Sequence, residues 1–166
     1  AKAPPDGYTI LSQGDTVMLQ GATKRVSFDV LKALDPIVPT SFQPYVLLMN
    51  LTLPVSSIRE LVAYSASQTV TYSGSSGVGS AVHLGMERLA QLSGARLLFV
   101  PYKGSAPAIL AVMGGEIHIA AGSAIAASGA IRTGKVRALA ALGLTRIPSM
   151  PDLPTVAEQG FPGFKI

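Results

Sequence analysis

Short apolar runs rich in β-branched residues alternate along this chain with longer runs of helical period, and this alternation constrains the fold more than any other feature. Candidate strands span residues 8–12, 45–50, 70–72, 97–100, 117–120 and 136–142. Candidate helices span about 57–67, 80–93, 106–113, 124–132 and 155–160. Alternating strands and helices are typical of α/β proteins, so we predict a mostly parallel sheet flanked by helices.

Polar and glycine residues mark the expected ends of several helices. Ser57 with Glu60, and Thr155 with Glu158, have the spacing of a capping box at a helix start. Gly94 suits the left-handed conformation that often ends a helix, here the one that begins near Ser80.

The first 50 residues differ in pattern from the rest of the chain. They supply only one or two strands and weak helices, and prolines punctuate residues 35–44 in the manner of an extended connection. A chain of 166 residues has room for one domain and part of another. We therefore expect residues 1–50 to hold a remnant of one lobe with a crossover, and residues 51–164 to form a second, ligand-binding lobe.

The segment from Tyr72 to His83, YSGSSGVGSAVH, joins a candidate strand to a candidate helix and contains three glycines, four serines and no acidic or basic residue apart from the histidine. Backbone N–H groups at a helix start attract anions, and glycine allows a ligand to approach the main chain closely. This loop is therefore the strongest candidate for a binding site.

Two enzyme motifs that use glycine-rich turns do not fit its spacing. A phosphate-binding P-loop needs lysine after its last glycine, but Ser80 follows Gly79; a nucleophile elbow needs glycine where Val78 stands. A turn that only lets strand and helix pack closely is the competing interpretation. The hydroxyl groups of Ser75 and Ser76, like that of Ser80, add neutral donors, and this favours reversible binding of a carboxylate.

Two further positions are candidates for ligand contact. Tyr102 and Lys103 follow another candidate strand, at the end where α/β sheets bind ligands, although a solvated turn is an equal alternative. His83 lies one turn into the helix after the glycine-serine loop, where it either approaches an anion or packs beneath the loop.

Composition excludes several functional classes. The absence of cysteine removes disulfides, thiolate nucleophiles and cysteine zinc sites, and no acid–base pair or metal-ligand spacing is visible, so we predict no catalytic residue, metal or cofactor. The net charge of +4 is dispersed, which argues against nucleic acid as a partner and leaves a mild bias toward anionic ligands. No apolar run reaches the roughly 18 residues of a membrane helix, and the first residues lack a signal-peptide pattern.

Five segments, taken in order, resemble the Bug family, the extracytoplasmic solute-binding receptors of tripartite tricarboxylate transporters. They are PDGYTIL, YSGSSGVGSAVHLGMERLAQLSG, FVPYKGSAPAILAVMGGEI, IRTGKVRALAALG and MPDLPTVAEQGFPGF, and together they extend from Asp6 nearly to Ile166. The resemblance implies a type II periplasmic-binding-protein-like fold, in which two α/β lobes close on a small organic carboxylate or dicarboxylate.

Family members are much longer, so the chain resembles a second lobe, about Leu51 to Phe164, that carries a remnant of the first. The resemblance implies a periplasmic or extracytoplasmic location and delivery of the ligand to membrane permease subunits. With one wall of the site missing, we expect the 166 residues alone to bind carboxylates weakly and to expose apolar surface that self-association would cover.

The resemblance also assigns ligand-binding positions. One carboxylate is implied to bind the loop residues Ser75, Ser76, Gly77, Val78, Gly79 and Ser80, with His83 on the following helix. Ser123 stands near the position from which the family presents an acidic or amide residue, and this departure disfavours an amino-acid ligand. Gly14 lies at the first-lobe strand end, beside Asp15, whose charge would oppose an anion unless it points away.

Two other functions remain open at this stage. A small acyl- or phosphoryl-transfer domain would need a base near Ser75 or Ser76, and His83 is the available one. An effector-binding domain of a transcription regulator would share the two-lobe fold.

Overall fold

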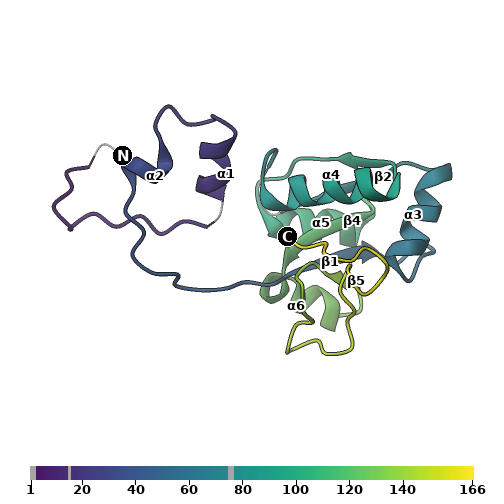
Figure 1. The fold of residues 1–166 in the computed structure, drawn as a ribbon. Coiled ribbons are helices and arrows are strands. Elements are labelled where there is room, and N and C mark those ends of the chain that lie inside the picture. Colours follow the sequence, from purple (N-terminus) through teal and green to yellow (C-terminus); the bar gives the residue numbers. More distant parts are fainter. Residues whose placement is uncertain (1–2, 15, 75–76) are drawn as a thin grey trace. The chain divides into compact units, whose positions relative to one another are not determined.

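The computed structural model describes residues 3–14, 16–74 and 77–166, and the chain divides into two compact units, Ala1–Phe42 and Gln43–Ile166 (Figure 1). The first unit contains two short helices, α1 (Thr16–Ala22) and α2 (Val30–Ala33). Among its described residues, Val30 is the single buried hydrophobic side chain. The predicted strand at residues 8–12 is wrong, because this exposed segment pairs with none of the described strands.

The boundary between the units, after Phe42, lies within the proline-punctuated segment 35–44 that was expected to connect two lobes. Strand β1 (Tyr45–Asn50), which was grouped with residues 1–50, belongs to the second unit. The physical reason is backbone pairing: β1 forms ladders with two strands of the second unit and lies between them. The correspondence of the two units to receptor lobes remains a prediction.

The second unit is built on a five-stranded sheet in the order β3-β2-β4-β1-β5. Its other strands are β2 (Val70–Ser73), β3 (Leu97–Phe99), β4 (Ile119–Ser123) and β5 (Val136–Ala141). Strand β2 is parallel to β3 and β4, whereas β1 is antiparallel to both β4 and β5. Four strands therefore run in one direction with β1 reversed among them, and the predicted α/β class is confirmed.

Helices cover both faces of this sheet. They are α3 (Ile58–Ser67), α4 (Ala81–Ser93), α5 (Ser105–Gly114) and α6 (Ala124–Arg132). Because side chains alternate along a strand, Leu47 and Met49 of β1 pack with α3 and α4, while Val46 and Leu48 pack with α5 and α6. The layers are visible in Figure 1, where α4 and α6 lie on opposite sides of the sheet.

The four helices of the second unit begin and end close to the predicted positions. Ser57 caps α3 and Ser80 caps α4, each through a side-chain oxygen that accepts a backbone N–H, and α4 ends at Gly94 in the left-handed conformation. These predictions are confirmed because capping depends on local sequence.

The predicted helix at residues 155–160 is wrong, although its capping box forms. The Thr155 N–H donates to Glu158 Oε2 at 2.7 Å, and the Glu158 N–H donates to Thr155 Oγ1 at 3.1 Å. The segment consists of turns and reaches Gly160, whose φ is +109°, within two turns of its start. Thr155 instead pairs with Ala141 in a β-bridge, so the first residue of the segment has extended rather than helical partners.

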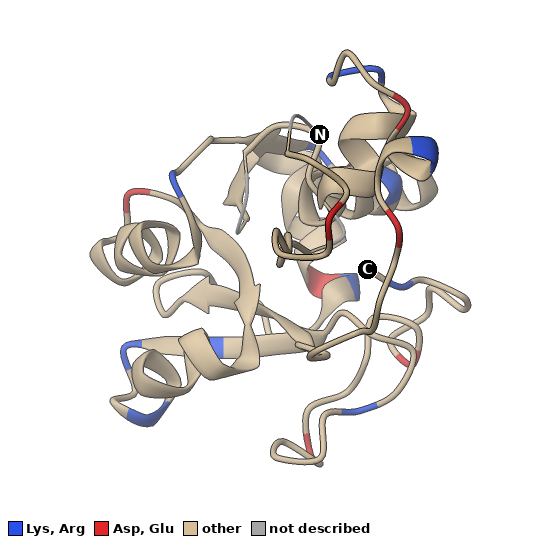
Figure 2. Ribbon diagram, turned by 90° about the vertical axis from the view of Figure 1, so that its left-hand side faces the viewer, with Lys and Arg blue, Asp and Glu red and all other residues tan. Residues whose placement is uncertain are grey.

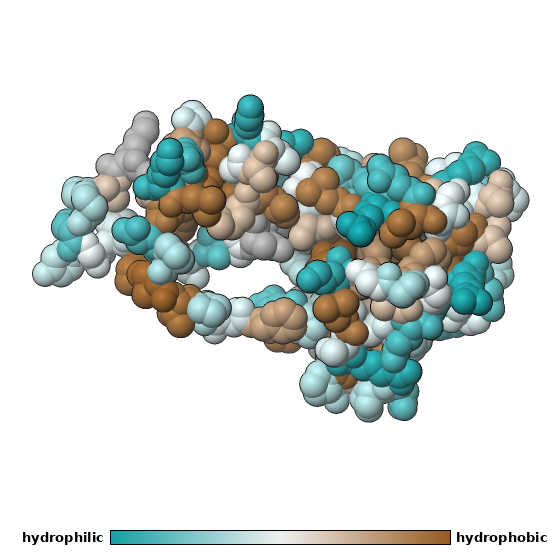
Figure 3. Space-filling view, viewed as in Figure 1, coloured by the Kyte–Doolittle hydropathy of each residue, from teal (hydrophilic) through white to brown (hydrophobic). Residues whose placement is uncertain are grey.

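Charged residues are scattered thinly over the ribbon, with basic and acidic positions interspersed (Figure 2). Hydrophilic and hydrophobic groups are likewise intermixed on the visible face of the second unit (Figure 3). Within the described ranges, no helix is both long enough and apolar enough to cross a bilayer.

Candidate functional site

The carboxyl ends of β2 and β4 form the point at which the strand order reverses. After β2 the chain passes through α4 to β3, on one side; after β4 it passes through α6 to β5, on the other. Strands β2 and β4 are direct neighbours, with Ser73 opposite Ala120. Open α/β sheets bind ligands outside such a switch point, so the loops after β2 and β4 are placed where a site is expected.

The loop between β2 and α4 is shaped by glycines with different roles. A Cβ atom on Gly74 would lie 2.4 Å from Val82 Cγ1, so this glycine allows the strand end to approach α4 closely. Gly79 adopts a φ of +82° and Gly77 a φ of +39°, which side-chain-bearing residues rarely adopt. Ser75 and Ser76 lie outside the described residues, so their predicted role stays a prediction.

His83 binds the loop rather than leaving it open. The Gly79 N–H donates to His83 Nδ1 at 3.1 Å, and the His83 N–H donates to Ser80 Oγ at 3.3 Å. The Ser80 N–H in turn donates to the Gly77 carbonyl at 3.4 Å. A neutral imidazole that accepts at Nδ1 carries its proton on Nε2. Of the backbone donors expected to be bare, those of Gly79 and Ser80 are therefore already occupied.

The first two helical amides of α4 are the donors that remain at this loop. Within the described part of the chain, the N–H groups of Ala81 and Val82 have no hydrogen-bond acceptor. Amides in the first turn of a helix lack intrahelical acceptors and lie at the positive end of the helix dipole. They can bind a carboxylate oxygen at the switch point.

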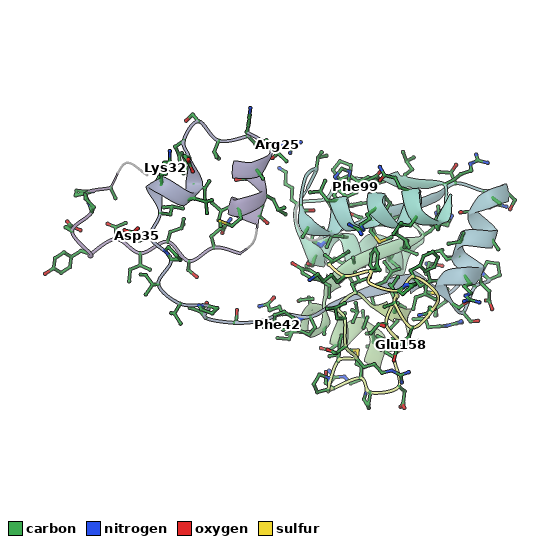
Figure 4. All side chains as sticks on the ribbon, viewed as in Figure 1. Arg25, Lys32, Asp35, Phe42, Phe99 and Glu158 are labelled. Atoms are coloured by element: carbon green, nitrogen blue, oxygen red, sulfur yellow. The ribbon has the colours of Figure 1, made fainter. Side chains whose placement is uncertain are left out.

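An aromatic cluster supports the loop from below. The His83 and Phe99 rings lie 4.4 Å apart between centroids, and the Phe99 and Tyr72 rings 5.2 Å apart. Figure 4 shows Phe99 beside α4. The Tyr72 hydroxyl donates to Glu87 Oε1 at 2.7 Å, and burial, followed by this carboxylate, raises the pKa of Tyr72 well above its usual value. The cluster fixes the first turn of α4 against the sheet.

The turn between β3 and α5 holds Tyr102 and Lys103 in different settings. The Tyr102 hydroxyl donates to Glu116 Oε2 at 3.2 Å, and desolvation of the phenol, followed by this bond, raises the pKa of Tyr102. Glu116 follows the C-terminus of α5, so the hydroxyl is directed away from the helix start. Lys103 is exposed and, among the described residues, makes no ion pair or hydrogen bond.

Ser123 ends β4 and caps α6, its Oγ accepting the Ala126 N–H at 3.3 Å. The preceding Gly122 lies against the start of α5, because a Cβ atom built on it would be 3.5 Å from Ser105 Cβ. The starts of α5 and α6 therefore meet at the carboxyl end of β4. Gly14 belongs to the first unit, where it is exposed, and its predicted role stays a prediction.

Sequence reasoning missed two hydroxyl groups at this edge, those of Ser73 and Ser105. Ser73 is fully buried, and its Oγ has no hydrogen-bond partner in the part of the chain that the structure describes. The available signal was a serine at the last position of an otherwise apolar strand, directly before Gly74.

Among residues 3–14, 16–74 and 77–166, no three His, Asp or Glu side chains are grouped to hold a metal ion.

Comparison with known proteins gives one consistent result. The family described as "Tripartite tricarboxylate transporter family receptor" matches residues 1–166. A UPF0065 protein from Bordetella pertussis is 35% identical over 164 residues, covering 96% of this chain and 50% of that protein. Protein BugT of the same bacterium is 33% identical over 168 residues, covering 99% and 52%. The chain thus spans about half the length of the curated relatives it matches.

Solved structures agree with the sequence relatives. A protein from R. palustris with adipate is 33% identical with a TM-score of 0.69, covering 75% of this chain and 42% of that one. MatC from Rhodopseudomonas palustris with bound malate is 30% identical with a TM-score of 0.67, over the same shares. A structure described as a periplasmic transporter has a TM-score of 0.85 at 29% identity, covering 97% and 55%.

Proposed function

This chain belongs to the tripartite tricarboxylate transporter receptor family, and from that premise we propose that it binds a small organic carboxylate as part of an extracytoplasmic solute receptor. The ligand site is the carboxyl edge of the sheet, between the loops that follow β2 and β4. In the complete receptor the ligand is released to membrane permease subunits. No catalytic step is part of this function.

The observation that carries the proposal is the start of α4 at the strand-order switch. Two amides, those of Ala81 and Val82, have no acceptor among the described residues and follow a loop that contains no acidic residue. Each hydrogen bond to a charged acceptor contributes roughly 1.5 to 3 kcal/mol. Because micromolar affinity needs about 8 kcal/mol, these donors supply part of the binding energy and require other groups around the ligand.

Adipate and malate, named in the titles of two similar structures, support a carboxylate ligand. Both acids carry two carboxylate groups, and neither carries an ammonium group. Ser123, at the end of β4, offers no carboxylate to such a group, which is consistent with a ligand of this kind. The proposed ligand class is therefore organic mono- and dicarboxylates rather than amino acids.

The contact between His83 and Gly79 argues against the alternative of an enzyme. A base that activates a serine needs a free nitrogen lone pair, but His83 Nδ1 already accepts the Gly79 N–H. The neutral ring then presents N–H at Nε2, which donates rather than accepts. His83 thus serves the shape of the loop, and its Nδ1 lone pair is not available to act as a general base.

The proposal is tested by deleting one backbone donor without changing the fold. Proline is well tolerated at the first position of a helix, and Ser80, with φ −73° and ψ 163°, already has the conformation that a following proline requires. Ala81→Pro removes one amide hydrogen, and Ala81→Ser is the matched control that keeps it.

The parent and both variants are expressed together with the natural sequence that flanks these 166 residues. Organic acids are then screened for binding by thermal shift and calorimetry. We expect carboxylates to bind the parent and Ala81→Ser alike, and to bind Ala81→Pro roughly 10- to 100-fold more weakly, the equivalent of one charged hydrogen bond. No binding of any organic acid to the parent, or unchanged binding to a folded Ala81→Pro variant, contradicts the proposal.

A further inference from the structure

His83, in the first turn of α4, contacts the preceding loop through both its ring and its backbone. Its Nδ1 accepts the Gly79 N–H at 3.1 Å, and its own N–H donates to Ser80 Oγ at 3.3 Å. The Ser80 N–H donates in turn to the Gly77 carbonyl at 3.4 Å. These bonds run in series from the helix into the loop, so a change at the ring reaches the residues that lead into α4.

The bond between Gly79 and His83 depends on the charge of the ring. A backbone N–H can only donate, so Nδ1 must present a lone pair, which the neutral ring has when its proton is on Nε2. A protonated imidazole donates at both nitrogens and has no lone pair to offer. Because histidine side chains change charge between about pH 5 and 8, the Gly79 amide gains or loses its acceptor within this range.

Packing against the sheet keeps the ring in place when it gains a proton. The half-buried His83 ring lies 4.4 Å from the Phe99 ring between centroids, and it stacks on the Tyr72 ring at 6.5 Å with 15° between the planes. Turning the imidazole over would present a C–H to Gly79, which is no acceptor either. Protonation therefore sets an N–H against the Gly79 N–H, and the loop is the part that has to move.

The titratable groups around the ring are Tyr72 on β2 and Glu87 on α4. The Tyr72 hydroxyl donates to Glu87 Oε1 at 2.7 Å, and because burial raises the pKa of Tyr72, its phenol stays neutral across this range. Phe99, from β3, carries no charge. The C-terminal segment packs on α4 at Gly85, two residues after His83 and so on nearly the opposite side of the helix. Of the described groups around the ring, Glu87 is thus the charged one, at the spacing that suits a pair with an imidazolium.

We propose that His83 is a positioning residue whose neutral ring holds the β2–α4 loop in its binding conformation, so that affinity for carboxylates falls when the ring is protonated. This inference rests on the proposed function and adds its regulation by pH. With the ring neutral, the amides of Ala81 and Val82 follow an anchored loop. With the ring protonated, the ligand has to order the loop as it binds, and this costs affinity. Glu87 offsets the charge of the imidazolium, so the lost anchor outweighs the attraction of that charge for an anion.

Two substitutions of His83 separate the acceptor from the titration. His83→Asn offers Oδ1 at the same place along the side chain as Nδ1 and cannot be protonated, whereas His83→Leu has neither acceptor nor charge. The other histidine of the chain supplies the matched control. The Thr71 N–H donates to His118 Nδ1 at 3.0 Å, but His118 directly precedes β4 and lies at the end of that strand away from the carboxyl edge. His118→Asn removes this second titration and leaves the loop unaltered.

The four proteins, each with its natural flanking sequence, are titrated with the organic acids of the binding screen, malate and adipate included, at about pH 8 and about pH 5.5. The pH dependence of His83→Asn reports the ionisation of the acid alone. Beyond that dependence, we expect the parent and His118→Asn to lose roughly 3- to 10-fold in affinity at the lower pH, the equivalent of one neutral hydrogen bond. His83→Asn should match the parent at the higher pH, and His83→Leu should bind more weakly than the parent there.

Proton release gives a readout that a purely structural role would not produce. If the neutral ring favours binding, binding must in return favour the neutral ring, so the parent releases protons when an acid binds within this pH range. Calorimetry in buffers of different ionisation heat measures the release, which should disappear in His83→Asn and persist in His118→Asn. In the ligand-free parent, hydrogen exchange of the Gly79 amide should accelerate as the nitrogen-NMR signal of His83 Nδ1 reports protonation.

The outcomes distinguish this inference from the proposed function. If carboxylates bind and Ala81→Pro weakens them, but the parent and His83→Asn share one pH dependence or the parent binds more tightly on acidification, the role of His83 is overturned and the proposed function stands. If no organic acid binds the parent at either pH, both are overturned. If His83→Asn does not fold, the parent decides: Gly79 exchange that ignores protonation of His83 overturns the inference.

Discussion

Helices α4 and α5 begin at the same edge of one sheet, each after a parallel strand, yet their first turns are built in opposite ways. At α4, His83 Nδ1 and Ser80 Oγ accept two backbone N–H groups, so the loop supplies its own acceptors. At α5, Gly104 offers no cap, and Lys103 has no partner among the described residues. In the described part of the chain the first two amides of both helices lack acceptors, but a side-chain cap is present only at α4.

The two turns differ in how far the protein itself satisfies their hydrogen-bond donors. A loop that satisfies most of its own donors keeps one conformation with or without ligand, and such preorganisation lowers the entropy lost on binding. Unsatisfied donors at α5 lower the stability of the free protein but gain more when an anion arrives. The β2–α4 loop is therefore the more preorganised of the two turns.

The largest expected effect on the free energy of unfolding concerns the close packing of Gly74 against Val82 in the β2–α4 loop. Gly74→Ala would place a Cβ atom 2.4 Å from Val82 Cγ1 and 2.8 Å from Val82 Cβ, and valine has no flexible end that can move away. We expect a loss of about 2 to 3 kcal/mol in the free energy of unfolding, measured by urea denaturation.

Two further variants check the cause. Gly74→Ala with Val82→Ala should recover part of the loss, because the clash is relieved. Gly129→Ala, in α6 with open space around the new methyl group, should instead stabilise the protein by about 0.5 to 1 kcal/mol. Equal losses at Gly74 and Gly129 would contradict close packing as the reason.

Substitution of Gly104, in the β3–α5 turn, should destabilise the protein for a different reason. Gly104 has a φ of +111° and a ψ of 174°, a conformation nearly restricted to glycine, but nothing lies within 4 Å of an added Cβ. Gly104→Ala is therefore expected to cost about 1 to 2 kcal/mol through backbone strain. Because no neighbour is displaced, truncating nearby side chains should not restore stability, and a rescue of that kind would refute the distinction.

Removing the serine hydroxyls at the helix starts should change the free energy of unfolding by a smaller amount. Ser80→Ala removes the hydroxyl that accepts the His83 N–H, so it should destabilise the protein by about 1 kcal/mol. Ser123→Ala, which removes the equivalent cap of α6, is a matched control with a similar loss. Ser105→Ala removes a hydroxyl that makes no hydrogen bond to any described residue and should leave the denaturation midpoint unchanged. A loss at Ser105 comparable to that at Ser80 would mean that the α5 turn is internally satisfied after all.

Sequence patterns predicted those features of this site that depend on neighbours in the chain. The caps at Ser57 and Ser80 and the strand at residues 70–72 required only local spacing, and each appears where expected. The reversed direction of β1 was not predictable, because an apolar run of six residues has the same pattern in either orientation.

Sequence patterns do not indicate features in which a residue's partner is distant in sequence or its segment is short. The hydrogen bond between Tyr102 and Glu116 is one such feature, and the ligand role of Tyr102 stays a prediction. Residues 155–160 carry correct capping residues, but Thr155 pairs with Ala141, a partner distant in sequence. Ser73 was overlooked because its importance lies in a missing partner, which only the packed structure reveals.

The smallest expected effect concerns two tyrosines, one preceding each helix. Tyr72 is enclosed and donates to Glu87 at 2.7 Å, whereas Tyr102 is only partly buried and donates to Glu116 at 3.2 Å. In both, burial is the main cause that raises the pKa, and the neighbouring carboxylate adds to it. Both shifts favour the neutral phenol in the folded state.

Alkaline titration should therefore distinguish the two turns. A pKa raised on folding contributes stability below the unfolded value of about 10, and that contribution is lost as pH rises above it. Tyr102 should ionise while the protein is still folded, and Tyr72 only together with unfolding, because its enclosed ring cannot be charged beside Glu87 without opening the core. Ultraviolet absorbance of phenolate, with circular dichroism followed in parallel, separates these steps. Tyr102→Phe should remove a signal that precedes unfolding, and Tyr72→Phe one that coincides with it; the reverse order would mean that the first turn of α4, and not that of α5, is the open one.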